Sequence, residues 1–345
     1  MFRHPEFDAH ERVLYACDEE SGLRAIIAIH DTTLGPAFGG CRMWPYDDDD
    51  AALFDVLRLS RSMTAKAAIC DLPWGGGKAV IIGDPQRDKT EALLKAMGRL
   101  VESLGGRYVI ADDVGTTLQD LAVMRSETTH TAAATEKAMQ PWPVTAYGVL
   151  MAIESSIEEV IGRRDLQGLR VAVQGLGNVG MPLCAYLHER GARLVVTDTD
   201  ASRVRDARDR YAATAVAPDD IYSAEADLFA PCALGAILDD DNIARLRVKV
   251  VCGGANNQLR ESRHDAALAA RGITFVPDYL ASAAGVIDFH QESLDDSPEA
   301  LRAAVERIRA ITREVLRRAR KRGVTPLAAA DDMVRARLTA ARDPV

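Results

Sequence analysis

The stretch GLRVAVQGLGNVG, residues 168–180, constrains the fold more than any other part of the chain. A short apolar run typical of a buried strand leads into Gly175, Gly177 and Gly180, spaced as GxGxxG, and a helical pattern follows. In a βα unit the first glycine permits a tight turn, the second lets a ligand approach the backbone, and the third lets the helix pack closely on its strand. The same glycine spacing also occurs in ordinary βα turns. The surrounding sequence must therefore decide between an ordinary turn and one that binds a ligand.

The surrounding sequence continues the same rhythm from Leu169 to about Phe275. Apolar runs such as RLVVTD, ADLFAPCA and ITFVPDY alternate with longer helical patterns. This succession predicts a doubly wound parallel sheet with right-handed crossovers, that is, a Rossmann domain. Asp198 ends the second run, where a carboxylate accepts hydrogen bonds from the adenosine ribose hydroxyls of NAD. We therefore expect NAD, although Arg203 and Arg205 lie close enough in sequence to keep NADP open.

The length of 345 residues exceeds what one core usually supports, so we expect two domains of α/β class. Strand and helix patterns also alternate in the first third, and two prolines in MQPWPVTAYG mark a boundary near Pro141. We expect a substrate-binding domain over 1–140 and the NAD domain over 141–323. Ser297-Pro298 should open a long helix that Gly323 stops, and the last helix, within 324–345, should pack back on the first domain.

Composition excludes several classes of function. The formal net charge is -9 and no run of lysine and arginine is flanked by aromatic residues, so we expect no nucleic-acid partner. No apolar stretch reaches the length of a signal peptide or membrane span, so we expect a cytoplasmic enzyme without a membrane partner. The six cysteines are scattered without a CxxC pair, which supports neither a disulfide framework nor a metal site.

Two lysines lie within otherwise apolar segments of the sequence. Lys66 lies in SMTAKAAIC, and Lys78 directly follows a triple glycine. They do not form a P-loop, which needs glycine where Leu72 stands and Ser or Thr where Ala79 stands. A lysine after three glycines can be desolvated, and a desolvated amine can serve as a general base. A solvated surface charge is the ordinary alternative for either lysine.

Asp112 and Asp113 end the run RYVIADD, which should be a strand opening into a glycine-containing loop. Reacting carboxylates are often found at such strand ends. A helix-capping or turn role is equally compatible with the sequence.

Seven motifs occur in order along nearly the whole chain: GPAFGGCRMWPY, MTAKAA, GGGKAVIIGDP, ADDVGTT, PVTAYGV, VQGLGNVG and GGANNQL. Together they resemble the glutamate/leucine/phenylalanine/valine dehydrogenase family, and most of all its short branch acting on apolar amino acids. The resemblance implies two domains separated by an active-site cleft, and a homo-oligomer, dimer or higher. It implies NAD-dependent, reversible oxidative deamination of an L-amino acid to its 2-oxo acid and ammonia.

The resemblance also implies roles for individual residues. Lys66 would bind the substrate carboxylate, aided by the backbone at Gly39 and Gly40 and by Asn256 or Asn257. Lys78 would activate the attacking water, and Asp113 would shuttle protons to the amino group. The residues expected to bind the cofactor are Thr145, Gly175, Gly177, Asn178, Val179, Gly180, Asp198, Ala255 and Asn256.

The expected side-chain pocket carries no cation for a distal carboxylate, which disfavours glutamate. Its residues are Phe38, Ala111, Val286 and Phe289. We favour a leucine- or valine-type substrate, while two phenylalanines could also stack on phenylalanine or tryptophan.

The sequence departs from the family pattern at four places. Ser282 stands for asparagine, Ala284 for glycine, Cys41 for threonine and Trp142 for a smaller polar residue. These departures keep an unusual amino-acid substrate open. A catalytically silent, NAD-binding regulatory protein is a more distant alternative, and intact Lys66, Lys78 and Asp113 argue against it.

Overall fold

The computed structural model of the chain describes residues 2–132 and 143–342. The chain divides into two compact units, Met1–Gln140 with Ala336–Val345, and Pro141–Arg335. The expected boundary residue Pro141 and the departure at Trp142 lie outside the described residues. The assignment of a substrate domain, an NAD domain and a cleft stays a prediction.

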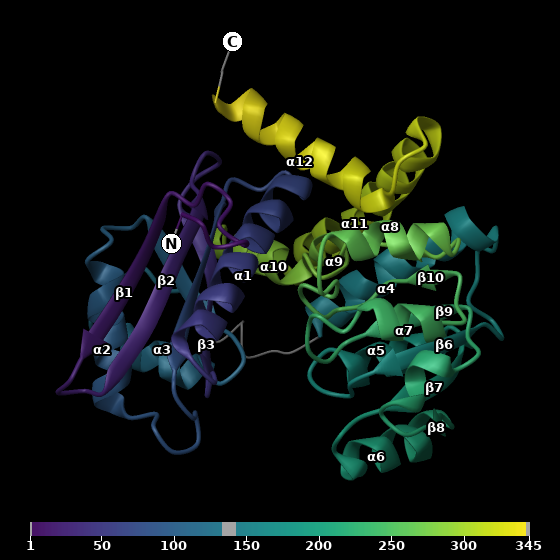
Figure 1. Cartoon of the computed structure of the whole chain (residues 1–345), viewed down its shortest axis with the longest axis horizontal. Coiled ribbons are helices and arrows are strands. Elements are labelled where there is room, and N and C mark those ends of the chain that lie inside the picture. Colours follow the sequence, from purple (N-terminus) through teal and green to yellow (C-terminus); the bar gives the residue numbers. More distant parts are fainter. Residues whose placement is uncertain (1, 133–142, 343–345) are drawn as a thin grey trace. The chain divides into compact units, whose positions relative to one another are not determined.

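The first unit is built on a five-stranded mixed sheet in the order β1-β2-β4-β3-β5 (Figure 1). Strands β1 and β2 pair antiparallel, as do β2 and β4, whereas β3 runs parallel to both β4 and β5. The elements are β1 (Arg12–Asp18), β2 (Leu23–Asp31), β3 (Ala37–Trp44), α1 (Asp49–Ile69), β4 (Gly75–Ile82), α2 (Glu91–Glu102), β5 (Tyr108–Asp112) and α3 (Leu118–Met124).

The two faces of this sheet have different environments, because successive side chains of a strand point to opposite sides. Ala37, Cys41 and Met43 of β3 belong to the core that also contains the buried side chains of α2 and α3. By alternation Phe38, Gly40 and Arg42 face the other side, where α1 covers β2 and β4. Lys78 precedes the α2-side residue Ala79 on β4, so it faces that second side as well.

The second unit carries a six-stranded, all-parallel sheet in the order β11-β10-β9-β6-β7-β8. Its strands are β6 (Arg170–Gln174), β7 (Arg193–Thr197), β8 (Thr214–Ala215), β9 (Leu228–Pro231), β10 (Val250–Val251) and β11 (Thr274–Phe275). The first strand in sequence, β6, lies between β7 and β9, so the winding reverses there as in a Rossmann sheet. The doubly wound fold predicted from the sequence is confirmed.

Helices of the second unit follow the strands in the alternating order expected of such a sheet (Figure 1). They are α4 (Val144–Ser156) continuing into a π-helical turn (Ile157–Ile161), α5 (Gly180–Glu189), α6 (Ala201–Tyr211), a 3-10 turn (Asp220–Ser223), α7 (Asp240–Arg245), α8 (Arg263–Ala270), α9 (Asp278–Ala281), α10 (Ala284–Ser293), α11 (Pro298–Arg322) and α12 (Pro326–Arg342).

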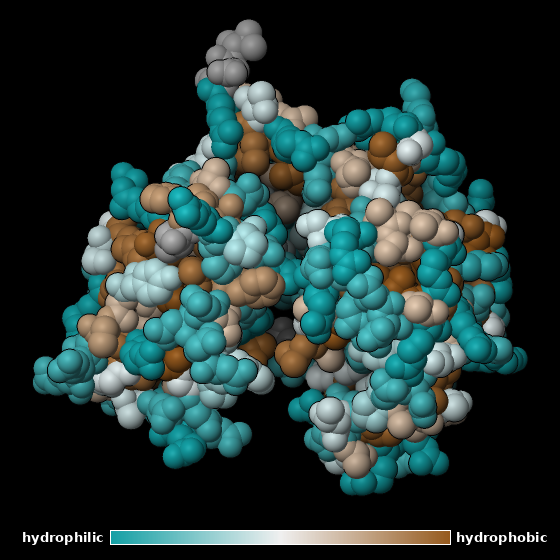
Figure 2. Space-filling model, in the orientation of Figure 1, coloured by the Kyte–Doolittle hydropathy of each residue, from teal (hydrophilic) through white to brown (hydrophobic). Residues whose placement is uncertain are grey.

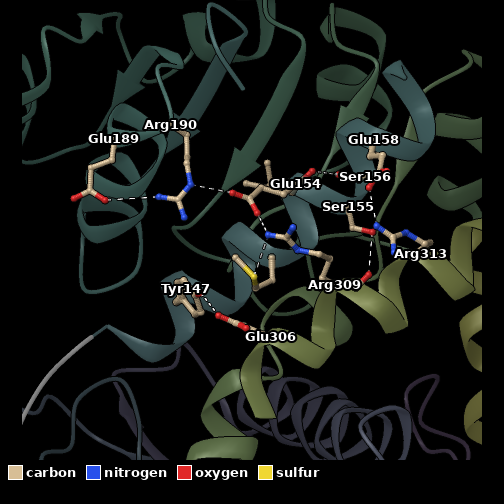
Figure 3. Close-up of polar contacts among 12 residues, drawn as sticks. Tyr147, Glu154, Ser155, Ser156, Glu158, Glu189, Arg190, Glu306, Arg309 and Arg313 are labelled. Atoms are coloured by element: carbon tan, nitrogen blue, oxygen red, sulfur yellow. Dashed lines mark hydrogen bonds and ion pairs between the residues drawn. The ribbon is translucent and has the colours of Figure 1, made fainter. Parts of the chain in front are cut away.

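Helix α11 is held along α4 by a row of ion pairs (Figure 3). Arg309 pairs with Glu154, and Arg313 Nη2 lies 2.7 Å from a carboxylate oxygen of Glu158. Glu154 also accepts from Arg190 of α5 at 3.1 Å, so one carboxylate joins three helices. This network of ion pairs fixes the register of α4 against α11.

The last helix, α12, contains the boundary between the two units, since Arg335 belongs to the second and Ala336 to the first. Its C-terminal part makes two ion pairs with the first unit, one to the end of β2 and one to the turn after α1. Arg337 Nη2 lies 2.8 Å from Asp71, and Arg342 Nη2 lies 2.5 Å from Asp31.

The surface is mostly polar on the face visible in Figure 2, where apolar residues occur in scattered areas among hydrophilic ones. Among the helices formed by residues 2–132 and 143–342, none is both long and apolar enough to cross a bilayer. All six cysteines are free thiols.

Candidate active site

Lys78 and Asp113 form a buried ion pair at the centre of the first unit's sheet. Lys78 is 5% exposed in the middle of β4, and Asp113 directly follows β5. Lys78 Nζ lies 2.9 Å from Asp113 Oδ2. The two residues face the side of the sheet where β3 and β5 carry Phe38, Gly40 and Ala111. Of the two aspartates considered from the sequence, Asp113 is the one that contacts the lysine.

Two glycines of β3 let this pair form between closely spaced strands. A Cβ on Gly40 would lie 2.8 Å from Asp113 Cβ and 3.1 Å from Lys78 Nζ, so any side chain there would push the pair apart. A Cβ on Gly39, which faces the opposite side, would lie 1.8 Å from the carbonyl oxygen of Gly77. The Gly39 carbonyl accepts a hydrogen bond from the buried hydroxyl of Tyr108 at 2.6 Å.

The position of Asp113 is fixed by its own backbone. Its amide donates to Thr116 Oγ1 at 3.0 Å, and the Thr116 hydroxyl lies 2.7 Å from the carbonyl oxygen of Cys41, to which it donates. Burial opposes ionisation of Asp113, but the charges of Lys78 and Arg42 outweigh it and hold the pKa of its carboxyl well below the ordinary value. Asp113 is therefore a carboxylate while both of these cations are charged.

Sequence reasoning missed three residues beside this pair. Arg42 Nε lies 3.1 Å from Asp113 Oδ2, and its Nη1 lies 2.8 Å from Asp55 Oδ2 on α1. The hydroxyl of Tyr46 donates to the same Asp55 oxygen at 2.6 Å. For Arg42 the sequence offers one signal. It lies two residues after Gly40, and in a strand this spacing puts both residues on the same face.

Lys66 lies in the last turn of α1 and is 7% exposed. The end of α1 adjoins the start of β4, because a Cβ on Gly76 would lie 2.1 Å from Thr64 Oγ1. Both lysines singled out from the sequence are thus buried rather than solvated. Phe38, 5% exposed, packs its ring near Trp74, with centroids 6.2 Å apart.

The glycine-rich turn of the second unit has the geometry of a dinucleotide-binding turn. Gly175 has φ 88°, and a Cβ on it would lie 2.8 Å from Ala233, just after β9. A Cβ on Gly180 would lie 1.8 Å from the Gly175 carbonyl oxygen, so only glycine lets α5 begin this close to β6. The turn therefore lies at the carboxyl ends of β6 and β9, where the winding of the sheet reverses and such sheets bind ligands.

Asp198 lies directly after β7 and holds this turn. Its Oδ2 accepts from the Leu176 amide at 2.6 Å, and its Oδ1 accepts from the Asp200 amide at 2.8 Å. Arg203 Nη1 lies 3.9 Å from the same Oδ2, so the nearest cation is already beside a carboxylate. The glycine-rich turn fits a dinucleotide of the NAD(P) type.

Of the other expected cofactor residues, Ala255 and Asn256 belong to a segment that approaches the glycine-rich turn. Gly254, next to Ala255 and Asn256, approaches Val179 so closely that a Cβ on it would lie 2.6 Å from Val179 Cγ1. Asn257 has φ 50°, a conformation that asparagine tolerates better than most residues. Thr145 lies in the first turn of α4 near α10, since a Cβ on Gly285 would lie 3.6 Å from its Oγ1. Asn178 is exposed, and Val286 and Phe289 are buried on α10.

The departures from the family pattern have local structural consequences. Ser282 Oγ donates to the backbone oxygen of Asp278 at 2.7 Å, within its own helical segment. Ala284 packs on α4 where that helix has Gly148, because a Cβ on Gly148 would lie 2.6 Å from the Ala284 methyl carbon. Cys41 is fully buried and burial raises the pKa of its thiol to about 12, so it is not a nucleophile.

Comparisons with known proteins place this architecture in a family. Residues 10–130 match the sequence model described as "Glu/Leu/Phe/Val dehydrogenase, dimerisation domain". Residues 142–208 and 197–343 match "Glutamate/Leucine/Phenylalanine/Valine dehydrogenase". The chain belongs to this dehydrogenase family.

Individual members of the Glu/Leu/Phe/Val dehydrogenase family are similar over nearly the whole chain. A leucine dehydrogenase of Bacillus subtilis (strain 168) is 45% identical over 98% of this chain and 94% of its own. A phenylalanine dehydrogenase of Bacillus thermotolerans is 42% identical over 96% of this chain and 89% of its own. The crystal structure of L-tryptophan dehydrogenase from Nostoc punctiforme, 41% identical, matches with a TM-score of 0.80 over 97% of each chain.

Membership in the Glu/Leu/Phe/Val dehydrogenase family confirms the resemblance seen in the ordered motifs. It also sets the class of enzyme, an amino-acid dehydrogenase, which is an oxidoreductase acting on CH–NH2 donors.

Proposed function

We propose that this family member catalyses the NAD-dependent, reversible oxidative deamination of an apolar L-amino acid, with a leucine- or valine-type substrate favoured. The reaction converts the amino acid, NAD and water into the 2-oxo acid, ammonium, NADH and one proton. The observation that carries the proposal is the buried Lys78–Asp113 pair, 2.9 Å apart, because a positioned amine and carboxylate are what proton transfer to water and to a departing nitrogen requires.

The residues of the first unit divide the chemistry as follows. Lys66 pairs with the substrate carboxylate, and the backbone at Gly39 and Gly40 adds hydrogen bonds. Bound NAD supplies the acceptor for the hydride that leaves Cα. Lys78, after giving up its proton, takes one from the water that attacks the substrate iminium, and Asp113 carries protons to and from the nitrogen.

The experiment that tests this proposal is an amino-acid panel. The purified chain is mixed with NAD and one L-amino acid at alkaline pH, and NADH is followed by its absorbance. We expect turnover with leucine, valine and related apolar side chains, and none with glutamate. Lack of turnover with every amino acid would leave the silent NAD-binding alternative standing.

An aromatic substrate is the second candidate, and one contact favours it. The rings of Phe38 and Trp74 pack 6.2 Å apart at a tilt of 52°, so an aromatic surface already exists beside β3. Aromatic side chains prefer such tilted or offset partners. Higher kcat/KM for phenylalanine or tryptophan than for leucine in the same panel would select this candidate.

Replacement of Lys66 by glutamine should chiefly weaken substrate binding. The side chain is buried, so loss of its charge removes an ion pair to the substrate carboxylate that is worth most when desolvated. We expect KM for the amino acid to rise by about 100-fold while kcat falls by less than about tenfold. Steady-state kinetics at saturating NAD measure both, and a fall in kcat at constant KM would contradict the assigned role.

Replacement of Asp198 by asparagine should shift preference from NAD toward NADP. The amide oxygen can still accept from the Leu176 amide, but the negative charge that repels a 2′-phosphate is gone and Arg203 loses a partner. We expect kcat/KM with NAD to fall, and that with NADP to rise, by about tenfold each. Adding Arg203→Gln should abolish the gain with NADP; an unchanged preference in Asp198→Asn would show that this carboxylate does not select the cofactor.

We also propose a cytoplasmic homo-oligomer. The family model that matches residues 10–130 is described as a dimerisation domain, which supports self-association of the first unit. Light scattering coupled to size exclusion measures the mass directly, and a mass of 37.4 kDa would contradict this part of the proposal.

A further inference from the structure

Asp113 contacts two cations, and only one of them has a role in the proposed chemistry. Lys78 Nζ and Arg42 Nε lie 2.9 and 3.1 Å from the same carboxylate oxygen, Oδ2. The backbone N–H of Val114 also donates to this carboxyl group. The side chain of Arg42 is 17% exposed, so its charge is poorly screened by solvent.

Arg42 is itself held in place from a different element. Its Nη1 lies 2.8 Å from Asp55 Oδ2 on α1, and Tyr46, just after β3, donates to that same oxygen at 2.6 Å. The two contacts use two nitrogens of one planar fork, so the guanidinium cannot turn without losing one of them. Burial lowers the pKa of Arg42, but Asp113 and Asp55 outweigh it and raise it, so its charge is permanent.

We propose that Arg42 is a positioning residue for the Lys78–Asp113 pair, and that Asp55 and Tyr46 fix the guanidinium that does the positioning. Arg42 locks the rotamer of Asp113 so that Oδ2 stays beside Lys78 Nζ. It also keeps Asp113 paired when Lys78 has given up its proton, a state in which the buried carboxylate would otherwise stand alone. The inference rests on the proposed function, because it assigns Arg42 to the same reaction.

The electrostatic consequence has a definite sign. A fixed positive charge beside the pair lowers its affinity for protons, so removing that charge must raise the pH at which the pair gives one up. Within the part of the chain that the structure describes, the other titratable or charged groups near the pair belong to neighbouring elements of the same unit. They include Cys41 on β3, Tyr46 after it, Asp55 on α1, Tyr108 and Asp112 on β5, and Asp120 on α3. These six groups are neutral or negative, so none of them replaces the charge of Arg42.

The test compares Arg42→Gln and Arg42→Lys with Arg24→Gln. Arg24 also reaches from a strand of this sheet to an aspartate of α1, with Nη2 2.6 Å from Asp49, but the pair is exposed and far from Asp113 in the sheet order. The same chemical change can thus be made outside the site. Kinetics over a range of pH, thermal unfolding and added guanidinium are measured for each variant.

We expect Arg42→Gln to lower kcat by about 100-fold with KM within about threefold, since misplacement of a reacting group costs turnover rather than binding. The acid limb of its kcat/KM profile should move to higher pH by about one unit. Added guanidinium should restore part of the kcat of Arg42→Gln. Arg42→Lys keeps the charge but not the planar pair of donors, so its kcat should lie between those of wild type and Arg42→Gln. Arg24→Gln should match wild type.

Wild-type kcat and an unshifted profile in Arg42→Gln would overturn the inference and leave the proposed function intact. If Arg42→Gln does not fold, Arg42→Lys decides, because wild-type turnover in that variant would show that the fork is not needed. Absence of turnover in both wild type and Arg24→Gln would instead reject the proposed function, and the inference with it.

Discussion

Replacement of Lys78 by alanine should lower kcat by about 1,000-fold or more, the range lost with a general base, while KM changes little. Lys78 is 5% exposed in the middle of β4, and its ammonium pairs with Asp113. The other cation at this carboxylate, Arg42, cannot take over, because an arginine does not give up its proton. Steady-state kinetics with the best amino acid of the panel measure both constants.

Two further variants separate chemistry from folding. Lys78→Arg keeps a positive charge beside Asp113 but not a group that can become neutral, so it should be as inactive as Lys78→Ala. Lys89→Ala breaks a second lysine–aspartate pair of the same unit, Nζ to Asp120 Oδ2 at 2.8 Å. That control should lose stability with kcat reduced less than about tenfold. Substantial turnover in Lys78→Arg would contradict the role of Lys78 as base.

Replacement of Asp113 by asparagine should lower kcat by about 100-fold or more and also destabilise the chain by about 3 kcal/mol. The activity falls because an amide neither accepts nor returns a proton. The stability falls because Lys78 would lose the carboxylate beside it and Arg42 would keep only its pair with Asp55. Kinetics at a temperature where the variant is folded and denaturant unfolding of the free protein measure the two effects separately.

Asp120→Asn is the matched control for Asp113→Asn, since it removes the charge from another partly buried aspartate that pairs with a lysine. We expect it to destabilise without a comparable loss of kcat. If Asp113→Asn loses stability but keeps wild-type turnover, Asp113 is a structural counter-ion and another group moves the proton.

Much of the second unit could be predicted because its local signals agree with its packing. The strand, glycine turn and helix around residues 168–180 lie where the pattern indicates, and the sheet has the expected winding. The long helix α11 begins after Ser297, whose hydroxyl oxygen accepts from the Ala300 amide, and ends at Gly323 with φ 66°. Caps of this kind depend only on a few adjacent residues, so they can be read from the sequence.

Strand β3 could not be predicted, although it places Gly40 and Arg42 beside the Lys78–Asp113 pair. Its sequence, AFGGCRMW, has two glycines in the interior, and glycine ordinarily indicates a turn. Here the glycines are needed because Gly77 and the Lys78–Asp113 pair approach the strand from neighbouring strands. That requirement arises only after distant segments have paired, so no local pattern reveals it.

The same reason explains why Arg42 was missed while Lys78 and Asp113 were found. The family resemblance implies a role for the lysine and the aspartate. Arg42 also stands in a family motif, but no role was inferred for it, and it is recognised only by its contacts with Asp113 and with Asp55 on α1. Those contacts join β3, the loop after β5 and α1, and the spacing of these segments in sequence predicts no contact among them.

The central claim is that an amino acid loses a hydride from Cα and then its nitrogen as ammonia. The most direct test uses the preferred amino acid deuterated at Cα, with wild-type protein and NAD, and counts the products. The account predicts deuterium in the reduced cofactor and equal amounts of NADH, 2-oxo acid and ammonia. Reduced cofactor without the label, or formed without an equal amount of ammonia, would contradict it.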